Sequence, residues 1–529
     1  MSESKWRASL KPNRRDFVGG ALAAGPILGA EAMSGFNPLS AATPKKGGHI
    51  RLGVAEGSTS DLLDPAPDSS AFITFLSSTY LSQLTEVSAD GSLKPLLAES
   101  FEASADAKKW TFDLRKGVEF HDGKSLTADD VVATINHHRD EDSKSSMKAF
   151  AAQVEDIKAD GKNRVILTLK EGNADYPFIL STGSFSILPS EDGKVMADAG
   201  NGTGPFVLKD IERGVRANLE RNPNYFGDDA AHADSAEVLI IADAAARTNA
   251  LLTDEVDLID KLDLKTLDLL KRSSDDIEIL DVTGTQHYTL PMNTTLAPFD
   301  DNNVRMALKH AINREELLDK ILRGHGAIGN DHPISPANRY FNTELEQRPY
   351  DPEKAKFYLK EAGLSSLDVK LSASEAIWTG AIDAVTLYSE HAAKAGINLQ
   401  VNRVPNDGYW SNVWMTHPWA ASYWSGRPTE DWMFSQGYAA DSSWNETFWK
   451  NDSFNGLLKA ARAELDDAKR KQMYWEMQAL VRDDGGSVVP LFANHVMGYN
   501  KKKLGHPDKI GGNWNLDGYK ILQRWWTTS

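Results

Sequence analysis

Alternating apolar and polar residues predict several β-strands. In KKWTFDLRKGVEFHDG, 108–123, Trp110, Phe112 and Leu114 fall on one face, because side chains two residues apart on a strand share a face. Other predicted strands show the same alternation, or a short apolar run bounded by turn residues. They lie at 47–56, 163–170, 201–210, 214–226 and 487–492.

Helical periodicity and helix-capping residues predict helices between these strands. Thr127 followed by Asp130 is a capping pair at the start of SLTADDVVATINHHR. Asp351, Pro352 and Gly363 mark a second helix, since proline suits the first turn and glycine the C-terminal end. Further helices are expected within 237–260, 301–322, 383–395 and 464–485, with a short break near Asn313. Strands and helices therefore alternate in mixed order, which predicts an α/β chain with at least two lobes.

The composition is that of a large folded protein with an acidic surface. The 529 residues are 41% hydrophobic and 25% charged, with a net charge of −17 and no cysteine. Such a charge disfavours nucleic acid and anionic membranes as partners, because both would repel it. The absence of cysteine excludes disulfides, thiol nucleophiles and cysteine-held metals.

The N-terminal segment predicts export. Arg14 and Arg15 precede a short stretch rich in glycine and alanine, and SAA at 40–42 offers small residues for cleavage. This pattern resembles a bacterial twin-arginine signal, so residues 1–42 are expected to be a signal peptide handled by the twin-arginine export machinery. No later segment reaches the roughly 18 apolar residues of a membrane span, and a periplasmic protein is predicted.

The chain lacks recognisable motifs for catalysis, nucleotide binding or metal binding. GHGAIG, 324–329, matches a dinucleotide-binding pattern, but that pattern should follow a strand and open a helix. Here it follows a predicted helix and leads into the prolines of NDHPISP. SSMK, 145–148, has no KTG partner, and His137 and His138 are adjacent rather than at metal-binding spacing. We therefore predict a binding protein, not an enzyme, with no cofactor and no metal.

Several stretches resemble the large solute-binding proteins of ABC importers, family 5, which includes dipeptide-, oligopeptide- and nickel-binding receptors. The longest is GSLKPLLAESFEASADAKKWTFDLRKGVEFHDGKSLTADDVVATI, 91–135. Shorter stretches follow in the family's order at 202–208, 221–226, 292–317 and 323–336, the last matching a glycine-rich loop followed by prolines. The resemblance covers nearly the whole chain after the N-terminal segment.

The resemblance implies a two-lobed periplasmic-binding-protein fold of type II, in the large class with an extra subdomain. Lobe I would be formed by 43–79, 206–290 and 491–529, with an inserted subdomain at 80–205, and lobe II by 291–490. Two hinge strands would join the lobes, which would close over a ligand and present a surface to the ABC permease in the inner membrane. We expect the receptor to be a monomer.

The segment YWSGRPTEDWMF, 423–434, is where the resemblance places the ligand. In peptide-binding members an acid in this segment receives the peptide's α-amino group, and Arg427 takes its place here. By ungapped counting, Glu375 falls where dipeptide binders carry an arginine for the peptide carboxylate. An ordinary dipeptide would then meet like charges at both ends. A guanidinium suits a carboxylate or phosphate, so we expect a small polar ligand with an anionic group, such as an opine-like conjugate, a modified peptide or an acidic sugar derivative.

Aromatic and polar side chains near Arg427 and near the hinge complete the predicted ligand site. The rings would offer flat walls, although core packing is the alternative for each of them. The polar groups would fix the orientation of the ligand. Besides Arg427 and Glu375, the predicted ligand-binding residues are Tyr409, Trp410, Trp424, Ser425, Asp431, His287 and Tyr288.

Other interpretations stay open at this point. Arg427 has an alternative role in a structural ion pair with Glu430 or Asp431, with Pro428 stiffening the turn. An exported hydrolase is a second possible class of protein, because twin-arginine export serves proteins that fold before export. A receptor for a metal chelate or haem is the third.

Overall fold

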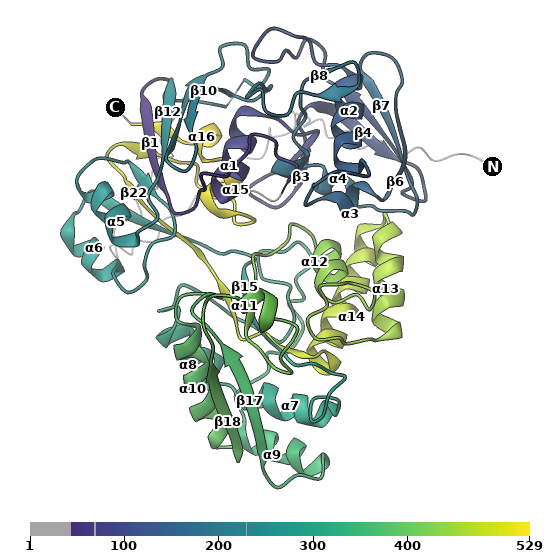
Figure 1. The fold of residues 1–529 in the computed structure, drawn as a ribbon, viewed down its shortest axis with the longest axis vertical. Coiled ribbons are helices and arrows are strands. Elements are labelled where there is room, and N and C mark those ends of the chain that lie inside the picture. The colour runs from purple at the N-terminus through teal and green to yellow at the C-terminus, as the bar shows by residue number, and fades with distance from the viewer. Residues whose placement is uncertain (1–43, 68–69, 229, 529) are drawn as a thin grey trace, which may run out of the picture. The chain divides into compact units, whose positions relative to one another are not determined.

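The computed structural model describes residues 44–67, 70–228 and 230–528, and the predicted signal peptide lies outside this part of the chain. The largest sheet has seven strands and belongs to lobe I (Figure 1). In spatial order they are β10 (Phe206–Glu212), β11 (Arg216–Arg221), β12 (Ser235–Ile240), β1 (His49–Val54), β13 (Leu258–Ile259), β22 (His495–Asn500) and β14 (Ile277–Val282). Strand β1 runs parallel to both of its neighbours, and the other pairs are antiparallel.

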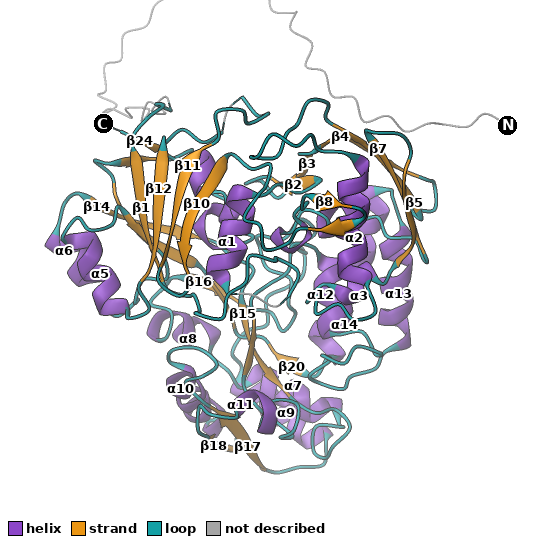
Figure 2. Ribbon diagram, turned by 45° about the horizontal axis from the view of Figure 1, so that its top comes forward, coloured by secondary structure: helices purple, strands orange, loops and turns teal. Residues whose placement is uncertain are grey.

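Helices cover both faces of this sheet, because neighbouring residues on its strands point into different cores (Figure 2). Leu258 packs with α1 and the C-terminal helices, whereas Ile259 packs with α5 and α6. These helices are α1 (Ala71–Tyr80), α5 (Ala244–Leu252), α6 (Leu267–Ser273), α15 (Asn515–Tyr519) and α16 (Ile521–Arg524). A small ladder of β23 (Leu504–Gly505) and β24 (Trp526–Thr527) accompanies the C-terminal segment.

An inserted subdomain has its own sheet and its own core. Its four strands lie in the order β4 (Ala98–Ala103), β5 (Lys109–Leu114), β7 (Arg164–Leu169) and β6 (Val154–Ala159). The alternating apolar residues of β5 are buried under α2. The accompanying elements are α2 (Ala128–Arg139), α3 (Lys148–Ala151), α4 (Tyr176–Ile179), a 3-10 turn (Gly183–Phe185), β2 (Thr85–Val87), β3 (Leu93–Pro95), β8 (Ser190–Glu191) and β9 (Lys194–Val195).

Lobe II packs helices around a parallel pair of strands and a second, smaller sheet. The parallel pair is β17 (Leu367–Ala373) and β18 (Ile397–Arg403), and its core is continuous with the smaller sheet. That sheet consists of β16 (Gly326–Ile328), β21 (Leu491–Ala493), β15 (His287–Pro291), β19 (Ser422–Trp424) and β20 (Ser487–Val488). The helices are α7 (Asn302–His310), α8 (Arg314–Lys320), α9 (Pro352–Glu361), α10 (Ala381–Ala393), α11 (Tyr409–Asn412), α12 (Glu430–Gly437), α13 (Asp452–Ala463) and α14 (Asp467–Asp484).

The chain crosses between the two sheets twice. Strand β14 of the large sheet continues through 283–286 into β15, and β21 continues through Asn494 into β22. The crossings lie side by side, since the Ala493 N–H donates to the Gln286 carbonyl at 2.9 Å and Asn494 Nδ2 donates to Asp281 Oδ1 at 2.6 Å. This arrangement is the two-stranded hinge of the predicted fold class; the exact domain boundaries stay predictions.

Most elements predicted from the sequence are confirmed, and two differ in detail. At the start of α2 the Thr127 N–H donates to Asp130 Oδ2 at 2.9 Å, as the capping pair predicts. The single strand predicted at 487–492 is divided into β20 and β21, with Pro490, which has no N–H, between them. The glycine-rich segment 324–329, expected as a loop, contains β16, which pairs with β21.

A buried ionic cluster ties the helical layer of lobe II to its smaller sheet. Asp331 is fully buried and forms ion pairs with Arg314, at 2.7 Å, and with Arg348. Its Oδ1 also accepts from the Val489 N–H at 3.1 Å, in the segment between β20 and β21. The two guanidinium groups hold the pKa of this carboxyl well below its usual range. Arg348 also pairs with the half-exposed Asp483 at 2.9 Å, so Asp331 is the fully buried carboxylate of this network.

We expect Asp331→Asn to destabilise the protein by about 3–5 kcal/mol, because Arg314 loses its ion-pair partner among the described residues and Arg348 keeps only the half-exposed Asp483. Glu353→Gln is the matched control, since Glu353 forms an exposed ion pair with Lys356 and its loss should change stability by less than about 0.5 kcal/mol. Urea unfolding of the two variants measures both values. Similar small losses in both variants would contradict the role assigned to Asp331.

Candidate functional site

The segment that carries Arg427 is packed against the hinge. Strand β19 pairs with β15, so Trp424 lies opposite His287 at the point where the chain leaves the hinge. Gly426 follows with a φ of +81°, and a Cβ there would lie 2.0 Å from Thr285 Oγ1. Only glycine fits this close approach without a shift. Gly512 of the C-terminal segment also approaches the hinge closely, since a Cβ there would lie 2.1 Å from the Thr283 carbonyl oxygen. Both lobes therefore meet at hinge residues 283–285, next to Arg427.

Among the described residues, Arg427 is a cation without a carboxylate partner. Its Nε donates to Gln436 Oε1 at 2.6 Å, and its Nη1 donates to the Gly426 carbonyl at 2.6 Å and to Ser425 Oγ at 3.2 Å. The guanidinium lies 5.4 Å from the Trp424 ring centre and 5.8 Å from that of Trp432. Burial lowers its pKa to about 10, so it stays charged at neutral pH. In the described part of the chain, no acidic group lies within ion-pair distance of it.

The alternative ion pair with Glu430 or Asp431 is not what the structure shows. Asp431 pairs with Arg462 of α13 at 3.1 Å, and Glu430 Oε1 accepts from the Tyr340 N–H at 2.6 Å. Both carboxylates are buried inside the helical layer of lobe II and serve its packing. Asp431, predicted as a ligand residue, is therefore already engaged by another arginine.

Exposed aromatic rings surround the strand that precedes Arg427. Trp410 lies 5.7 Å from Tyr423 and 6.0 Å from Trp414, and Trp444 lies 6.0 Å from Trp414 and 5.9 Å from Trp424, all between ring centres. Three of these rings face solvent, with 43% of Trp410, 37% of Tyr423 and 46% of Trp444 exposed. The rings meet edge to face or tilted rather than in flat stacks, which leaves ring faces open. We call Trp410, Trp414, Tyr423 and Trp444 the aromatic surface.

Three of the predicted site residues belong to the core or the hinge. Tyr409 is buried and donates its hydroxyl to the Ala421 carbonyl at 2.7 Å. Tyr288 is buried and stacks on Trp378 at 4.1 Å. His287 is fully buried, with Nδ1 3.1 Å from the Thr285 carbonyl, and burial lowers its pKa to about 4. Their side chains therefore lie in the packed interior next to the site.

Glu375 and Ser425 are exposed, in different settings. Glu375 Oε2 accepts from the Gly380 N–H at 2.7 Å and Oε1 from the Ile382 N–H at 3.3 Å, so its carboxylate caps the N-terminus of α10. Ser425 lies directly beside Arg427 and accepts from it. The structure thus brings Trp424, Ser425, His287 and Arg427 together, whereas Glu375 is engaged at a helix end. The role of each residue toward a ligand stays a prediction.

Sequence reasoning missed four residues around Arg427: Gln436, which holds its Nε, and Trp414, Trp444 and Glu446, which build the aromatic surface. The sequence did contain a signal for Trp444, since SSWNETFW at 442–449 is as aromatic as the segment around Arg427. Glu446 carried no signal, because an isolated acid in so acidic a chain is undistinguished.

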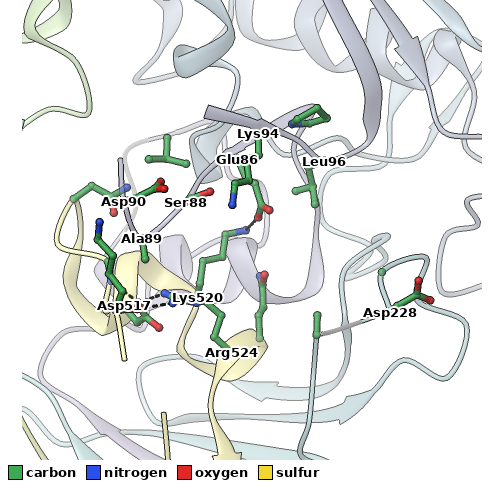
Figure 3. Close-up of a pocket in the computed structure, with 18 of the residues that line it drawn as sticks. Glu86, Ser88, Ala89, Asp90, Lys94, Leu96, Asp228, Asp517, Lys520 and Arg524 are labelled. Atoms are coloured by element: carbon green, nitrogen blue, oxygen red, sulfur yellow. Dashed lines mark hydrogen bonds and ion pairs between the residues drawn. The ribbon is translucent and has the colours of Figure 1, made fainter. Parts of the chain in front are cut away.

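A cavity of about 590 Å³ lies in lobe I between the β2–β3 hairpin and the C-terminal helices. Figure 3 shows Lys520 reaching toward Glu86, 3.7 Å apart, and Arg524 paired with Asp517. Lys520 and Arg524 thus already have acidic partners, unlike Arg427. For this reason we take the Arg427 segment as the better candidate site.

Two further features of the described residues bear on the class of site. Residues 44–67, 70–228 and 230–528 contain no group of three or more histidine or acidic side chains placed to hold a metal ion. Within the same ranges, no helix is both long and apolar enough to cross a bilayer.

Comparison with known proteins assigns the family. The model of bacterial extracellular solute-binding proteins, family 5, middle region, matches residues 92–446, so the chain belongs to this family. It is 26% identical over 447 residues to the dipeptide-binding protein of Escherichia coli, covering 75% of this chain and 80% of that protein. It is 32% identical over 298 residues to haem-binding protein A of Haemophilus influenzae, covering 51% of this chain and 54% of that protein.

The fold agrees with solved structures of the same class. The periplasmic binding protein DppA of Helicobacter pylori, an ABC-transporter-associated protein solved with the peptide STSA, superposes with a TM-score of 0.74 at 22% identity, covering 92% of this chain and 99% of that one. The predicted two-lobed type II fold is therefore confirmed. The predicted function, a solute-binding receptor of an ABC importer, is confirmed at the level of the family.

We expect Gly426→Ala to lower the stability of the ligand-free protein more than Gly363→Ala does. Both glycines have positive φ, which costs an alanine about 1–2 kcal/mol. Gly363 has open space around its Cβ position, whereas at Gly426 the methyl group would overlap Thr285 and add about 1–3 kcal/mol. Urea unfolding of both variants gives the difference, and equal losses would contradict the packing of this segment on the hinge.

Proposed function

We propose that this protein is the exported receptor of an ABC importer and that it captures a small polar ligand whose anionic group pairs with Arg427. The observation that carries the proposal is the partly buried guanidinium of Arg427, which has hydrogen-bonding neighbours but no acidic partner in the part of the chain that the structure describes. Burying a charge without a counter-charge is unfavourable. A ligand carboxylate or phosphate would supply that counter-charge and gain bidentate hydrogen bonds.

The position of Arg427 supports a role in closure. The residue lies beside hinge positions 283–285, which the C-terminal segment of lobe I approaches at Thr283 and the β19–α12 loop of lobe II approaches at Thr285. A ligand bound there touches both lobes and favours the arrangement in which they are close. The receptor reaches the periplasm through twin-arginine export. There it binds one ligand as a monomer and delivers it, chemically unchanged, to the membrane permease.

The peptide-like or opine-like character of the ligand follows from the family and from the sign of the charge at Arg427. Members named for dipeptides are among the relatives of this chain. At this position peptide binders carry an acid that receives the α-amino group of the peptide. An arginine in its place favours a ligand that has an anionic group at that end. Opine-like conjugates and modified peptides have this property.

Arg427→Ala should weaken binding of the natural ligand by roughly thirty-fold or more. Removing one member of a desolvated charge pair costs about 2–5 kcal/mol, and each 1.4 kcal/mol is a factor of ten. Native mass spectrometry of protein purified from its own periplasm identifies the retained ligand, and calorimetry then gives its Kd. Arg427→Lys should recover only part of the affinity, since an ammonium cannot form a two-pronged contact.

Arg164→Ala is the control for this experiment, because Arg164 forms an exposed ion pair with Asp113 on the inserted subdomain and should leave Kd unchanged. The melting temperature of ligand-free Arg427→Ala should stay equal or rise, since an unpaired buried charge is removed. A lower melting temperature with unchanged affinity would show that Arg427 is structural. Haem or a metal chelate in the mass spectrum would favour the third class of receptor.

Unmodified dipeptides such as Ala-Ala should bind weakly or not at all. Their α-amino group would face Arg427, and like charges in a desolvated cleft cost several kcal/mol. Calorimetry with a small panel of dipeptides measures this directly. Micromolar binding of several of them would overturn the charge exchange inferred at this position.

A further inference from the structure

One buried carboxylate, that of Glu446, orients two tryptophans beside the candidate site. Its Oε2 accepts from Trp414 Nε1 at 2.8 Å, and its Oε1 accepts from Trp424 Nε1 at 3.1 Å and from Thr289 Oγ1 at 2.7 Å. Glu446 is only 5% exposed, and none of the described lysines or arginines forms an ion pair with it. Burying such a group is costly, and indole and hydroxyl donors alone stabilise it here.

The two oriented indoles carry the aromatic surface. Trp414 contacts Trp410 and Trp444, and Trp424 also contacts Trp444. Fixing Trp414 and Trp424 therefore fixes the exposed rings that rest on them. Exposed aromatic clusters of this kind on one face of a protein commonly mark a binding site.

The aromatic surface adjoins the unpaired cation. Trp424 has the guanidinium of Arg427 5.4 Å from its ring centre and the exposed ring of Trp444 5.9 Å away. Tyr423 precedes Trp424 in β19 and lies 5.7 Å from Trp410, between ring centres. A single small molecule can thus reach the guanidinium with one end and the aromatic surface with the other.

The open ring faces of this surface suit a flat ring of a ligand. The indole N–H groups of Trp414 and Trp424 are both taken by Glu446, so they offer nothing to ligand hydroxyl groups. The open faces of Trp410, Trp444 and Tyr423 suit stacking or edge-to-face contact.

We infer that the ligand carries an aromatic ring next to its anionic group, that this ring packs on the aromatic surface, and that Glu446 is the positioning residue for it. This inference rests on the proposed function, in which Arg427 holds the anionic group. It narrows the ligand class to aromatic acids, including acidic conjugates of aromatic amino acids.

Two probes that differ only in the ring test the inference. N-benzoylglycine and N-acetylglycine share a carboxylate and an amide, and calorimetry gives both Kd values for the wild-type receptor. N-benzoylglycine should bind at least about tenfold more tightly. Trp444→Ala should remove most of this preference while changing the N-acetylglycine Kd less than about twofold. Phe357→Ala, which truncates an exposed ring on α9, should change neither value.

Glu446→Gln tests the positioning role. An amide keeps one acceptor oxygen and can no longer accept from both indoles, so the preference for N-benzoylglycine should fall while binding of N-acetylglycine persists. The near-ultraviolet circular dichroism of the tryptophans should change in this variant, and Glu446→Asp should restore part of the preference. A variant that loses stability but keeps the full preference would show that Glu446 is merely structural.

The two proposals fail in different ways. Three results would contradict the inference that the ligand carries an aromatic ring. They are equal affinity for both probes, no binding of N-benzoylglycine at millimolar concentration, and tighter binding of glucuronate than of either probe. If Arg427→Ala still weakens binding of the natural ligand in that case, the proposed function stands. Loss of both probes in Arg427→Ala, together with the tenfold preference in the wild type, supports both proposals.

Discussion

The approach of Gly426 to Thr285 is the constraint on which the site depends. The contact leaves no room for a Cβ, so the β19–α12 loop is held directly on one of the two connections between the lobes. Strand pairing of β19 with β15 brings the loop to this place, and Thr429, which accepts from the Trp432 N–H at 3.2 Å, starts α12 immediately after it. Arg427 occupies the short path between these two fixed points, and its position is therefore coupled to the hinge.

The role proposed for Arg427 is supported by comparison with the ion pairs of other buried charges. Asp431 is paired with Arg462, and Asp331 with Arg314 and Arg348. Asp175 of the inserted subdomain is paired with Arg470 of α14 at 2.5 Å. Each of these pairs offsets the cost of burial within the protein itself. Arg427 lacks such a pair among the described residues, and for this reason the proposed function gives it an anionic partner in the ligand.

Local signals in the sequence predicted what depends on local geometry. The alternation of Trp110, Phe112 and Leu114 predicted a buried strand face, and Thr127 with Asp130 predicted where α2 begins. The loop with Arg427 was found only because a family resemblance marked its position. Glu446 could not be predicted, since its partners Thr289, Trp414 and Trp424 lie between 22 and 157 residues away and are joined only by the tertiary fold.

The contacts of α12 connect the candidate site with the inserted subdomain. Gln436 Oε1 accepts from Arg427 Nε and also, at 3.1 Å, from Trp432 Nε1. The Trp432 ring packs on Phe150 of α3, with ring centres 4.6 Å apart, and belongs to the core of the subdomain. The Ala174 N–H, from the same subdomain, donates to the carbonyl of Arg462 at 2.7 Å.

Under the proposed function, a ligand that pairs with the Arg427 guanidinium would compete with Gln436 for that donor, and Gln436 also accepts from Trp432 Nε1. The charge of the ligand and the contact between lobe II and the subdomain are thus linked through one glutamine. Binding at this single cation would therefore act, through α12, on a contact between lobe II and the inserted subdomain.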